Sequence, residues 1–351
     1  MPDGERVNAC HPPVSGCGYN GHMTGWERKG ISGPRRAGLV MAAVFAVAMR
    51  VHASGAEYVL PENGDNVVGF VTTAIAQHED TMFDIGRRYG VGYEEILSAN
   101  PGIDPWLPGD GTEILIPTRF VLPVAPREAI VINLPEHRLY YYPPAKPGEP
   151  RVVRTYPIST AKMDWKTPLG VTRIVSKEKN PSWYPPASVL KEHEERGDPL
   201  PRVVPPGPDN PLGDRKMRLD IPGGAYLIHG TNRPAGVGMQ VTHGCIRMYP
   251  EDIGELFDLV NVNTRVNLVD QTTKVGWQRG TLFVERHPPL EGTRNPAHDD
   301  PQEMTRLLAK ASGGRKVALD WSGAQRAFLQ ATGVPVPLST PVRSAEMAGG
   351  Q

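Results

Sequence analysis

The sequence predicts a mainly β protein with three folded parts, and three observations indicate this. Glycine (38) and proline (37) are abundant among the 351 residues, which favours a loop-rich β structure over a helical bundle. Short apolar segments separated by turn residues fill a central region, 125–271, as in β-sheet proteins. A compact module over 72–118 precedes this region, and a small α/β extension over 272–340 follows it. The length and the 39% hydrophobic content suit more than one domain.

Residues 1–53 are expected to be an unstructured extension followed by a secretory signal peptide. Arg35 and Arg36 supply its positive flank, residues 37–49 are its apolar stretch, and cleavage is expected after Ala53. An apolar stretch this short cannot span a bilayer, so no permanent membrane anchor is expected. Cleavage would also remove Cys10 and Cys17.

The charges of the chain balance. There are 38 lysines and arginines against 38 aspartates and glutamates. A nucleic-acid partner would require an excess of basic side chains on one face, so none is expected.

Residues 72–118 read as a βααβ module. Strands are predicted over 73–77 and 113–117. The first helix is expected to have Asp80 as its N-cap and to stop at Gly90, and the second to end at Asn100. Fewer than fifty residues hold too small a core for much beyond a binding module.

This module resembles the LysM domain. The similarity is carried by Glu79-Asp80-Thr81, Tyr89-Gly90-Val91, the run 96–101 and Leu107-Pro108-Gly109. The resemblance implies binding of glycan that contains N-acetylglucosamine. The implied contact residues are Asp80, Thr81, Asn100, Pro101 and Ile103. The alternative is a degenerate module that serves as a structural spacer.

The central region is predicted from its strand and turn signals. Pro123 and Pro126 suggest that 119–128 is a short, stiff linker after a lead-in segment at 54–71. The expected strands cover 129–134, 138–142, 152–159, 226–229 and 264–269. A helix is expected to begin at Pro250, with apolar positions at 253, 256, 257 and 260 on one face. In the extension, a strand is expected over 281–285, helices over 301–310 and 322–331, and disorder in the last twelve or so residues.

A proline-rich segment covers 180–213. A loop of that length inside a domain is usually a lid or a binding loop. Trp183 and Tyr184 favour that interpretation over a solvated excursion.

Cys245 would be the only cysteine left after cleavage. It lies in Thr242-His243-Gly244-Cys245-Ile246-Arg247, and His229-Gly230 precedes it by sixteen positions. No cysteine remains to form a disulfide, and a structural zinc site would need further ligands, so no metal is expected. The pattern favours a nucleophile, with a small buried apolar thiol as the alternative.

A cysteine attacks a carbonyl as its thiolate, which requires a base nearby and donors for the oxyanion. His229, at the end of a strand, is placed to reach the thiol. His243 would share a face with Cys245 if the segment were extended. The amides of Gly244 and Cys245 are the expected oxyanion donors. Attack by a thiolate needs no organic cofactor, so none is expected.

These residues resemble the signature of the YkuD-type L,D-transpeptidases over about 125–271. The segment 204–213, the tail 274–290 and the preceding module are similar to the ErfK/YbiS subgroup. The resemblance implies a β-sandwich-like catalytic domain in a periplasmic protein that acts on peptidoglycan. Cys245 would attack the L-centre carbonyl of meso-diaminopimelate in a tetrapeptide stem and release D-alanine.

The sequence leaves the acyl acceptor open. The amine of a second diaminopimelate would give a 3→3 cross-link, and a lysine of an outer-membrane lipoprotein would give an attachment. With water as the acceptor, the protein would be a hydrolase at the same bond. A non-catalytic wall-binding protein is a third reading, which the intact set of His229, His243 and Cys245 disfavours.

The resemblance also implies roles for individual residues. His229 would be the base, with its ring oriented by the Gly230 carbonyl, and His243 would support it. Arg247 would hold a substrate carboxylate, with a structural salt bridge as the alternative. The further substrate-contact candidates are Thr242, Arg233, Trp183 and Tyr184.

Overall fold

The computed structural model describes residues 55–339 except 63, 163–166, 224–225, 294–297, 299 and 314–316. The described residues belong to one compact unit, Arg50–Gln351. The predicted signal peptide and almost all of the predicted disordered C-terminus lie outside the described residues. Among the residues that are described, no helix combines the length and the apolar character that crossing a bilayer would require.

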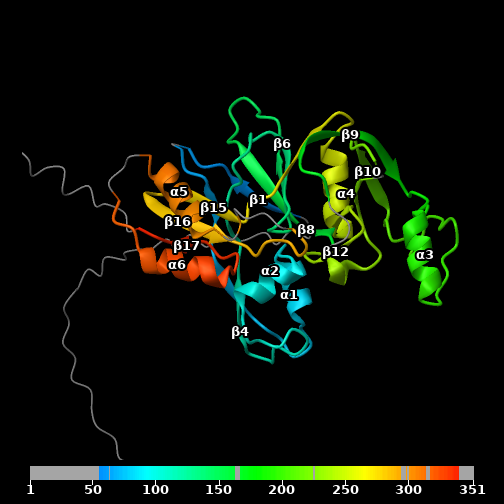
Figure 1. The fold of residues 1–351 in the computed structure, drawn as a ribbon, viewed down its shortest axis with the longest axis horizontal. Coiled ribbons are helices and arrows are strands. Elements are labelled where there is room, and N and C mark those ends of the chain that lie inside the picture. Colours follow the sequence, from blue (N-terminus) through cyan, green and yellow to red (C-terminus); the bar gives the residue numbers. More distant parts are fainter. Residues whose placement is uncertain are drawn as a thin grey trace, which may run out of the picture. The chain divides into compact units, whose positions relative to one another are not determined.

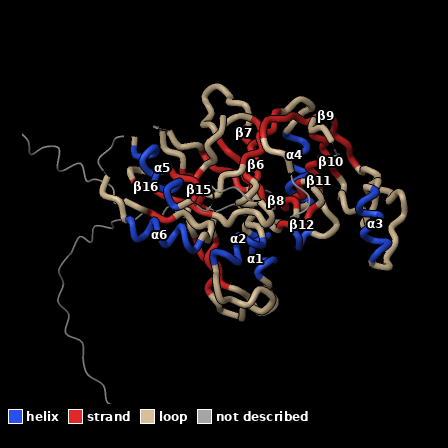
Figure 2. The backbone as a smooth tube through the Cα atoms, in the orientation of Figure 1, coloured by secondary structure: helices blue, strands red, loops and turns tan. Residues whose placement is uncertain are grey.

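The mainly β prediction is confirmed by a central ten-stranded sheet (Figures 1 and 2). Its strands are β1 (Ala56–Val59), β6 (Ala129–Asn133), β7 (Arg138–Tyr142), β8 (Val152–Ala161), β9 (Gly170–Lys179), β10 (Arg215–Leu219), β11 (Leu227–His229), β12 (Gln240–Thr242), β13 (Ile246–Met248) and β14 (Arg265–Val269). The order is β1-β8-β13-β11-β10-β9-β14-β6-β7, and β12 pairs with β8. Because β7 also pairs with β8, the pairing from β8 round to β7 closes on itself.

Strand β8 joins the two ends of this circuit. Its first part pairs with β1 and β7, and Ile158 and Ser159 pair with β13. Its last residues, Thr160 and Ala161, pair with β12. Strand β8 therefore lies directly beside the segment that leads to Cys245.

Helix α4 (Pro250–Leu259) packs against this sheet, as predicted. Proline occupies the first turn, where its missing N–H costs nothing, and Glu251 and Asp252 add negative charge at the N-terminal end. Ile253, Leu256 and Phe257 are buried in the main core. The helix follows Cys245 closely, so its packing fixes the C-terminal side of the nucleophile segment.

The βααβ prediction for 72–118 is confirmed by β3 (Thr72–Ile75), α1 (Met82–Arg88), α2 (Tyr93–Ala99) and β4 (Glu113–Ile116), with β3 and β4 antiparallel. The predicted N-cap was wrong. Thr81 caps α1, since its hydroxyl accepts from the Asp84 amide at 3.2 Å. Asp80 instead accepts from the Gln77 amide and pairs with Arg88 at 2.5 Å.

The lead-in at 54–71 and the linker at 119–128 were also predicted wrongly. Strand β1 pairs with β8 of the main sheet, and β2 (Val67–Gly69) pairs with β5 (Arg119–Val121). Phe120 and Leu122 are buried in a shared core. The prolines of 119–128 come after these apolar residues, so they mark the end of a strand instead of a free spacer.

The C-terminal extension forms a three-stranded sheet with two helices. Its elements are β15 (Thr273–Gln278), β16 (Thr281–Arg286), α5 (Pro301–Ser312), α6 (Trp321–Gln330) and β17 (Val336–Pro337). The predicted strand and both predicted helices are confirmed. Figure 1 shows α5 and α6 on either side of this sheet, and they share one core with it.

A buried ion network joins the extension to the central sheet. The Lys274 ammonium, fully buried, lies 2.7 Å from Glu285 and also contacts Glu136. Burial acts to lower the pKa of Lys274, but the two carboxylates raise it overall. Among the described residues, Glu136, Glu285 and His287 form the one group with metal-ligand geometry. The Lys274 ammonium already supplies a cation to both of its carboxylates.

Replacing Lys274 with methionine is expected to lower the free energy of unfolding by about 3–5 kcal/mol. The change would leave two buried carboxylates without their cation. Urea unfolding at pH 7 measures it. The control is Lys146→Met, because Lys146 forms an exposed pair with Glu149 at 3.5 Å and should change stability by less than about 1 kcal/mol. Equal losses in the two variants would contradict the expectation.

Candidate active site

The predicted catalytic residues meet in one cavity of about 780 Å³. It lies between β9–β13 and the 180–213 segment. Eight of the ten predicted active-site residues line it: Cys245, His229, His243, Gly244, Thr242, Arg247, Trp183 and Tyr184. Gly230 and Arg233 are outside the lining. A cavity of this size suits a peptide-sized substrate.

Strand pairing brings His229 and Cys245 to one edge of the cavity. Strands β11 and β13 are parallel neighbours, with His229 opposite Arg247. Cys245 lies two residues before Arg247, immediately ahead of β13. Since side chains alternate along a strand, Cys245 faces the same side as Arg247, and therefore the same side as His229 opposite it. The predicted position of His229 at the end of a strand is confirmed.

A backbone hydrogen bond sets the orientation of the His229 imidazole. Its Nδ1 lies 2.6 Å from the Gly230 carbonyl oxygen. A carbonyl can only accept, so Nδ1 carries the hydrogen and Nε2 keeps its lone pair. The predicted orienting contact is therefore present. It gives His229 the tautomer that a base for the thiol requires.

Burial controls the ionisation of both groups. Burial, together with the Arg247 charge, lowers the pKa of His229 to about 3. Burial also raises the pKa of the half-buried Cys245 thiol, although a Leu227 backbone hydrogen bond and Arg247 act in the opposite direction. Both shifts favour the neutral forms. At rest, the cavity is therefore lined by a neutral Cys245 thiol and a neutral His229 imidazole.

The nucleophile loop is held by two threonine hydroxyls. Thr242 donates to the Cys245 carbonyl at 2.6 Å, and Thr167 donates to the Gly244 carbonyl at 3.1 Å. Gly244 has φ of 101°, a conformation that favours glycine. Thr167 was missed by sequence reasoning because it lies 77 residues from its partner.

Arg247 presents a half-buried guanidinium at the cavity. Its Nε atom is buried without a hydrogen-bond partner. In the part of the chain that the structure describes, the charged or ionisable groups that act on the pKa of Arg247 are Cys245 and Arg233, and neither is a carboxylate. This disfavours the structural salt bridge considered above. Arg233 is exposed, and its amide bonds to the Thr231 hydroxyl at 2.9 Å.

His243 was expected to share a face with Cys245 if the segment were extended, and the segment is not extended there. The residues after Thr242 leave the strand, and the His243 ring turns toward helix α3 (Ala187–Glu195). Its Nε2 lies 2.9 Å from Glu192, which also pairs with Lys162 at 3.3 Å. Hydrogen bonds from His243 and Lys162 lower the pKa of Glu192 to about 2. The sequence carried no signal for this contact.

Helix α3 belongs to the predicted lid segment, 180–213. Trp183 and Val204 exchange two backbone hydrogen bonds, at 2.8 and 2.9 Å, which close the segment at its base. Trp183 is partly buried and Tyr184 is exposed, and both line the cavity. Figure 1 shows α3 beyond the ends of β9 and β10. The segment thus has the position that a substrate-binding lid would need.

The predicted glycan-contact residues occupy the loops of the βααβ module. Asn100 is buried, and its amide bonds the Ile96 and Leu115 carbonyls, each at 2.8 Å. Asp80 and Thr81 are used in the local contacts described above. Pro101 is exposed, and Ile103 packs partly against the module core. The side chains of Asn100, Asp80 and Thr81 thus stabilise the module itself.

Comparisons with known proteins identify the family of this chain. The YkuD family, the L,D-transpeptidase catalytic domain, matches residues 127–268. The protein named probable L,D-transpeptidase YcfS of Escherichia coli is 40% identical, over 76% of this chain and 82% of that protein. Probable L,D-transpeptidase ErfK/SrfK of the same species is 36% identical, over 85% and 96%.

A solved structure of an L,D-transpeptidase from Mycobacterium smegmatis is 19% identical over 45% of this chain and 63% of that chain, with a TM-score of 0.31. The long matches to YcfS and ErfK/SrfK decide the family. The chain belongs to the L,D-transpeptidase family.

Proposed function

We propose that this protein is a peptidoglycan L,D-transpeptidase and that Cys245 is its nucleophile. The family and the relatives' names support the activity. The single observation that carries the proposal is the His229–Gly230 hydrogen bond, because it places the hydrogen on Nδ1 and leaves the Nε2 lone pair on a ring that lines the same cavity as Cys245. The acyl donor is a tetrapeptide stem that ends in meso-diaminopimelate and D-alanine.

In the first half-reaction, the Cys245 sulfur attacks the L-centre carbonyl carbon while its proton passes to His229 Nε2. Amides of the nucleophile loop, at Gly244 and Cys245, stabilise the oxyanion. The tetrahedral adduct collapses, the bond to D-alanine breaks, and the leaving amine takes the proton from the imidazole. The product is a thioester between Cys245 and the tripeptide stem.

In the second half-reaction, an amine attacks the thioester and gives its proton to His229. A new amide forms, and the thiol is restored. Diaminopimelate as the acceptor gives a 3→3 cross-link, and a lipoprotein lysine gives an attached lipoprotein. With water instead, the enzyme acts as an L,D-carboxypeptidase or, on attached chains, releases lipoprotein. The acceptor depends on what the lid segment admits.

Arg247 is the proposed site for a substrate carboxylate. Among the described residues this half-buried guanidinium has no acidic partner, which favours an anionic ligand, and the planar group can bind a carboxylate through two hydrogen bonds. Tetrapeptide stems carry such groups on diaminopimelate and on D-alanine. Thr242, Trp183, Tyr184 and the exposed Arg233 would complete the contacts.

The module at 72–118 is proposed to be a LysM domain that binds glycan near the catalytic domain, and the 272–340 extension to support it. A signal peptide cleaved after Ala53 would deliver the protein to the periplasm, where its substrate lies. Because Asp80 and Asn100 are engaged internally, glycan contact would use the exposed loop at Pro101 and the loop backbones.

The function is tested with the mature protein and muropeptides that carry tetrapeptide stems, with and without an acceptor amine. Mass spectrometry identifies the products. Free D-alanine together with dimers supports transfer, whereas tripeptide monomers alone support hydrolysis. Wild-type protein that releases no D-alanine under either condition would contradict the proposal.

Glu192→Ala is expected to raise KM about two- to fivefold and to change kcat less. The substitution removes the contacts that tie α3 to His243 and Lys162. Ion pairs near the surface contribute little to stability, so the expected change is modest. Steady-state kinetics of D-alanine release measures it. The control is Glu195→Ala, on the same helix, because Glu195 forms an exposed ion pair with Lys191 at 3.7 Å, within α3 itself. Unchanged KM in Glu192→Ala would refute a role in lid closure.

A further inference from the structure

Strand β12 determines where the nucleophile loop starts. Gln240 and Thr242 lie on it, beside Thr160 and Ala161 of β8. The Thr242 hydroxyl bonds the Cys245 carbonyl, so a shift of β12 moves the nucleophile. What holds β12 therefore bears on the geometry of Cys245 and His229.

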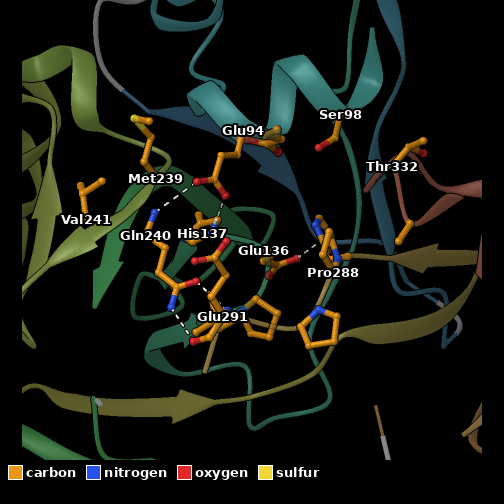
Figure 3. Close-up of a pocket in the computed structure, with 16 residues that line it drawn as sticks. Glu94, Ser98, Glu136, His137, Met239, Gln240, Val241, Pro288, Glu291 and Thr332 are labelled. Carbon is orange, nitrogen blue, oxygen red and sulfur yellow. Dashed lines mark hydrogen bonds and ion pairs between the residues drawn. The ribbon is translucent and has the colours of Figure 1, made fainter. Parts of the chain in front are cut away.

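The βααβ module is hydrogen-bonded to one side of this segment (Figure 3). The start of α2 donates twice to the chain just before β12, from Tyr93 to the Val237 carbonyl and from Glu94 to the Gly238 carbonyl, each at 3.2 Å. The Glu94 carboxylate then accepts from the Gln240 amide at 3.2 Å and pairs with His137 at 3.1 Å.

The C-terminal extension is hydrogen-bonded to the other side. The Gln240 side-chain carbonyl accepts from the Glu291 amide at 2.8 Å, and its Nε2 donates to the Glu291 carbonyl at 2.9 Å. This pairing satisfies the carboxamide and the peptide group together. Figure 3 shows Glu94, His137, Gln240 and Glu291 converging at one cavity, of about 360 Å³.

We propose that Gln240 is a positioning residue through which the module and the extension together hold the nucleophile strand. The proposal rests on the proposed function, since it concerns the geometry of the same thiol. Gln240 touches no substrate, and it acts through β12, Thr242 and the Cys245 carbonyl. Displacing reacting groups by about 1 Å costs about a hundredfold in rate, so a partial shift is expected to be visible in kcat.

The chain offers a matched control at Gln271. Its side chain makes the same two-bond pairing, with the Val124 amide at 2.9 Å and the Val124 carbonyl at 3.0 Å. Gln271 follows the C-terminal end of β14, and its pairing does not involve β12. Methionine at either position keeps the length of the side chain and removes the hydrogen bonds.

Gln240→Met is expected to lower kcat for D-alanine release about tenfold and to leave KM within about twofold. Gln271→Met is expected to keep the wild-type kcat. Its thermal midpoint should fall by about as much as that of Gln240→Met. On the module side, Glu94→Ala should lower kcat, and Glu94→Gln should restore it because the amide oxygen still accepts from Gln240. Equal kcat in Gln240→Met and Gln271→Met would overturn the proposal.

The rate at which iodoacetamide alkylates Cys245 separates this inference from the proposed function. A displaced β12 takes the thiol away from His229, so Gln240→Met should react about threefold more slowly, and Gln271→Met at the wild-type rate. This readout needs no turnover. A protein that alkylates as expected but releases no D-alanine would keep the inference and lose the proposed function. Identical alkylation rates in both variants would overturn the inference.

Discussion

Cys245→Ala is expected to abolish the release of D-alanine from tetrapeptide stems, with kcat at least about 10⁴-fold below wild type. Among the residues that the structure describes, Cys245 is the only cysteine, so losing its sulfur removes the thioester and with it the whole two-step route. The measurement is D-alanine released from muropeptides over hours, at enzyme concentrations that would detect residual turnover.

Loss of activity in Cys245→Ala could also arise from misfolding, and two controls address this. Cys245 is half-buried and makes no contribution to the main apolar cores, so the alanine variant should keep a wild-type thermal midpoint. Cys245→Ser should also fold and remain nearly inactive, because a hydroxyl is a much weaker nucleophile at neutral pH. D-Alanine release by the folded alanine variant at the wild-type rate would exclude Cys245 as the nucleophile.

His229→Gln is expected to lower kcat about 10²–10⁴-fold, the usual contribution of a general base. Glutamine can keep a hydrogen bond to the Gly230 carbonyl but cannot take the thiol proton. His243→Gln serves as the control, with a loss of about tenfold or less, because its Nε2 is directed to Glu192. If the two substitutions cost the same, the assignment of the base to His229 fails.

The same residue predicts a pH dependence of stability. His229 has a pKa of about 3 when folded, far below its ordinary value near 6.5. The unfolded chain therefore binds the proton first as pH falls. The contribution of the neutral His229 imidazole to the free energy of unfolding is fully present above about pH 6.5 and is lost as pH falls toward 3. Removing it in His229→Gln should make the slope of unfolding free energy against pH shallower by up to about 1.4 kcal/mol per unit in this window.

Acid unfolding of the two proteins measures that slope directly. His287, whose pKa burial lowers to about 4, adds a slope of the same sign over part of the range, and both proteins keep it. The difference between the curves therefore isolates His229. Parallel curves between pH 6.5 and 4 would mean that the imidazole is not held neutral by its surroundings.

Local patterns were enough to predict elements whose residues show a clear period or cap. Helix α4 follows from Pro250 and its apolar face, and β7 begins and ends where predicted. The βααβ module was predictable because each of its elements is short and bounded by turn residues. In these places the propensity and the burial of each residue agree.

Among the strands that were not predicted, β9, β10 and β15 have side chains that do not alternate in the expected way. Strand β10, Arg215–Leu219, has three basic residues in five, and β9 is exposed along much of its length. Ser176 and Glu178 of β9 and Lys216 and Arg218 of β10 line the cavity that holds Cys245, so these polar side chains face the cavity instead of a sealed apolar core. Strand β15 contains Lys274, whose burial depends on two carboxylates that are distant in sequence or on another strand.

The chemistry of the site was predictable, but the contacts that hold it were not. Cys245 and His229 stand out because thiols and imidazoles are few and their spacing is distinctive. Thr167, Glu192 and Gln240 are common surface residue types, and each acts through a partner far away in the chain. Such roles depend on tertiary packing, which short sequence patterns do not encode.

The most direct test is the mass of the protein after brief mixing with a tetrapeptide muropeptide, without an amine acceptor, and an acid quench. If Cys245 forms the thioester, the protein gains a mass equal to the stem without its D-alanine. The addition should map to the peptide that contains Cys245 and should disappear when an acceptor amine is added. D-Alanine release without any adduct on Cys245, or an adduct on another residue, would contradict the role of Cys245 as the nucleophile.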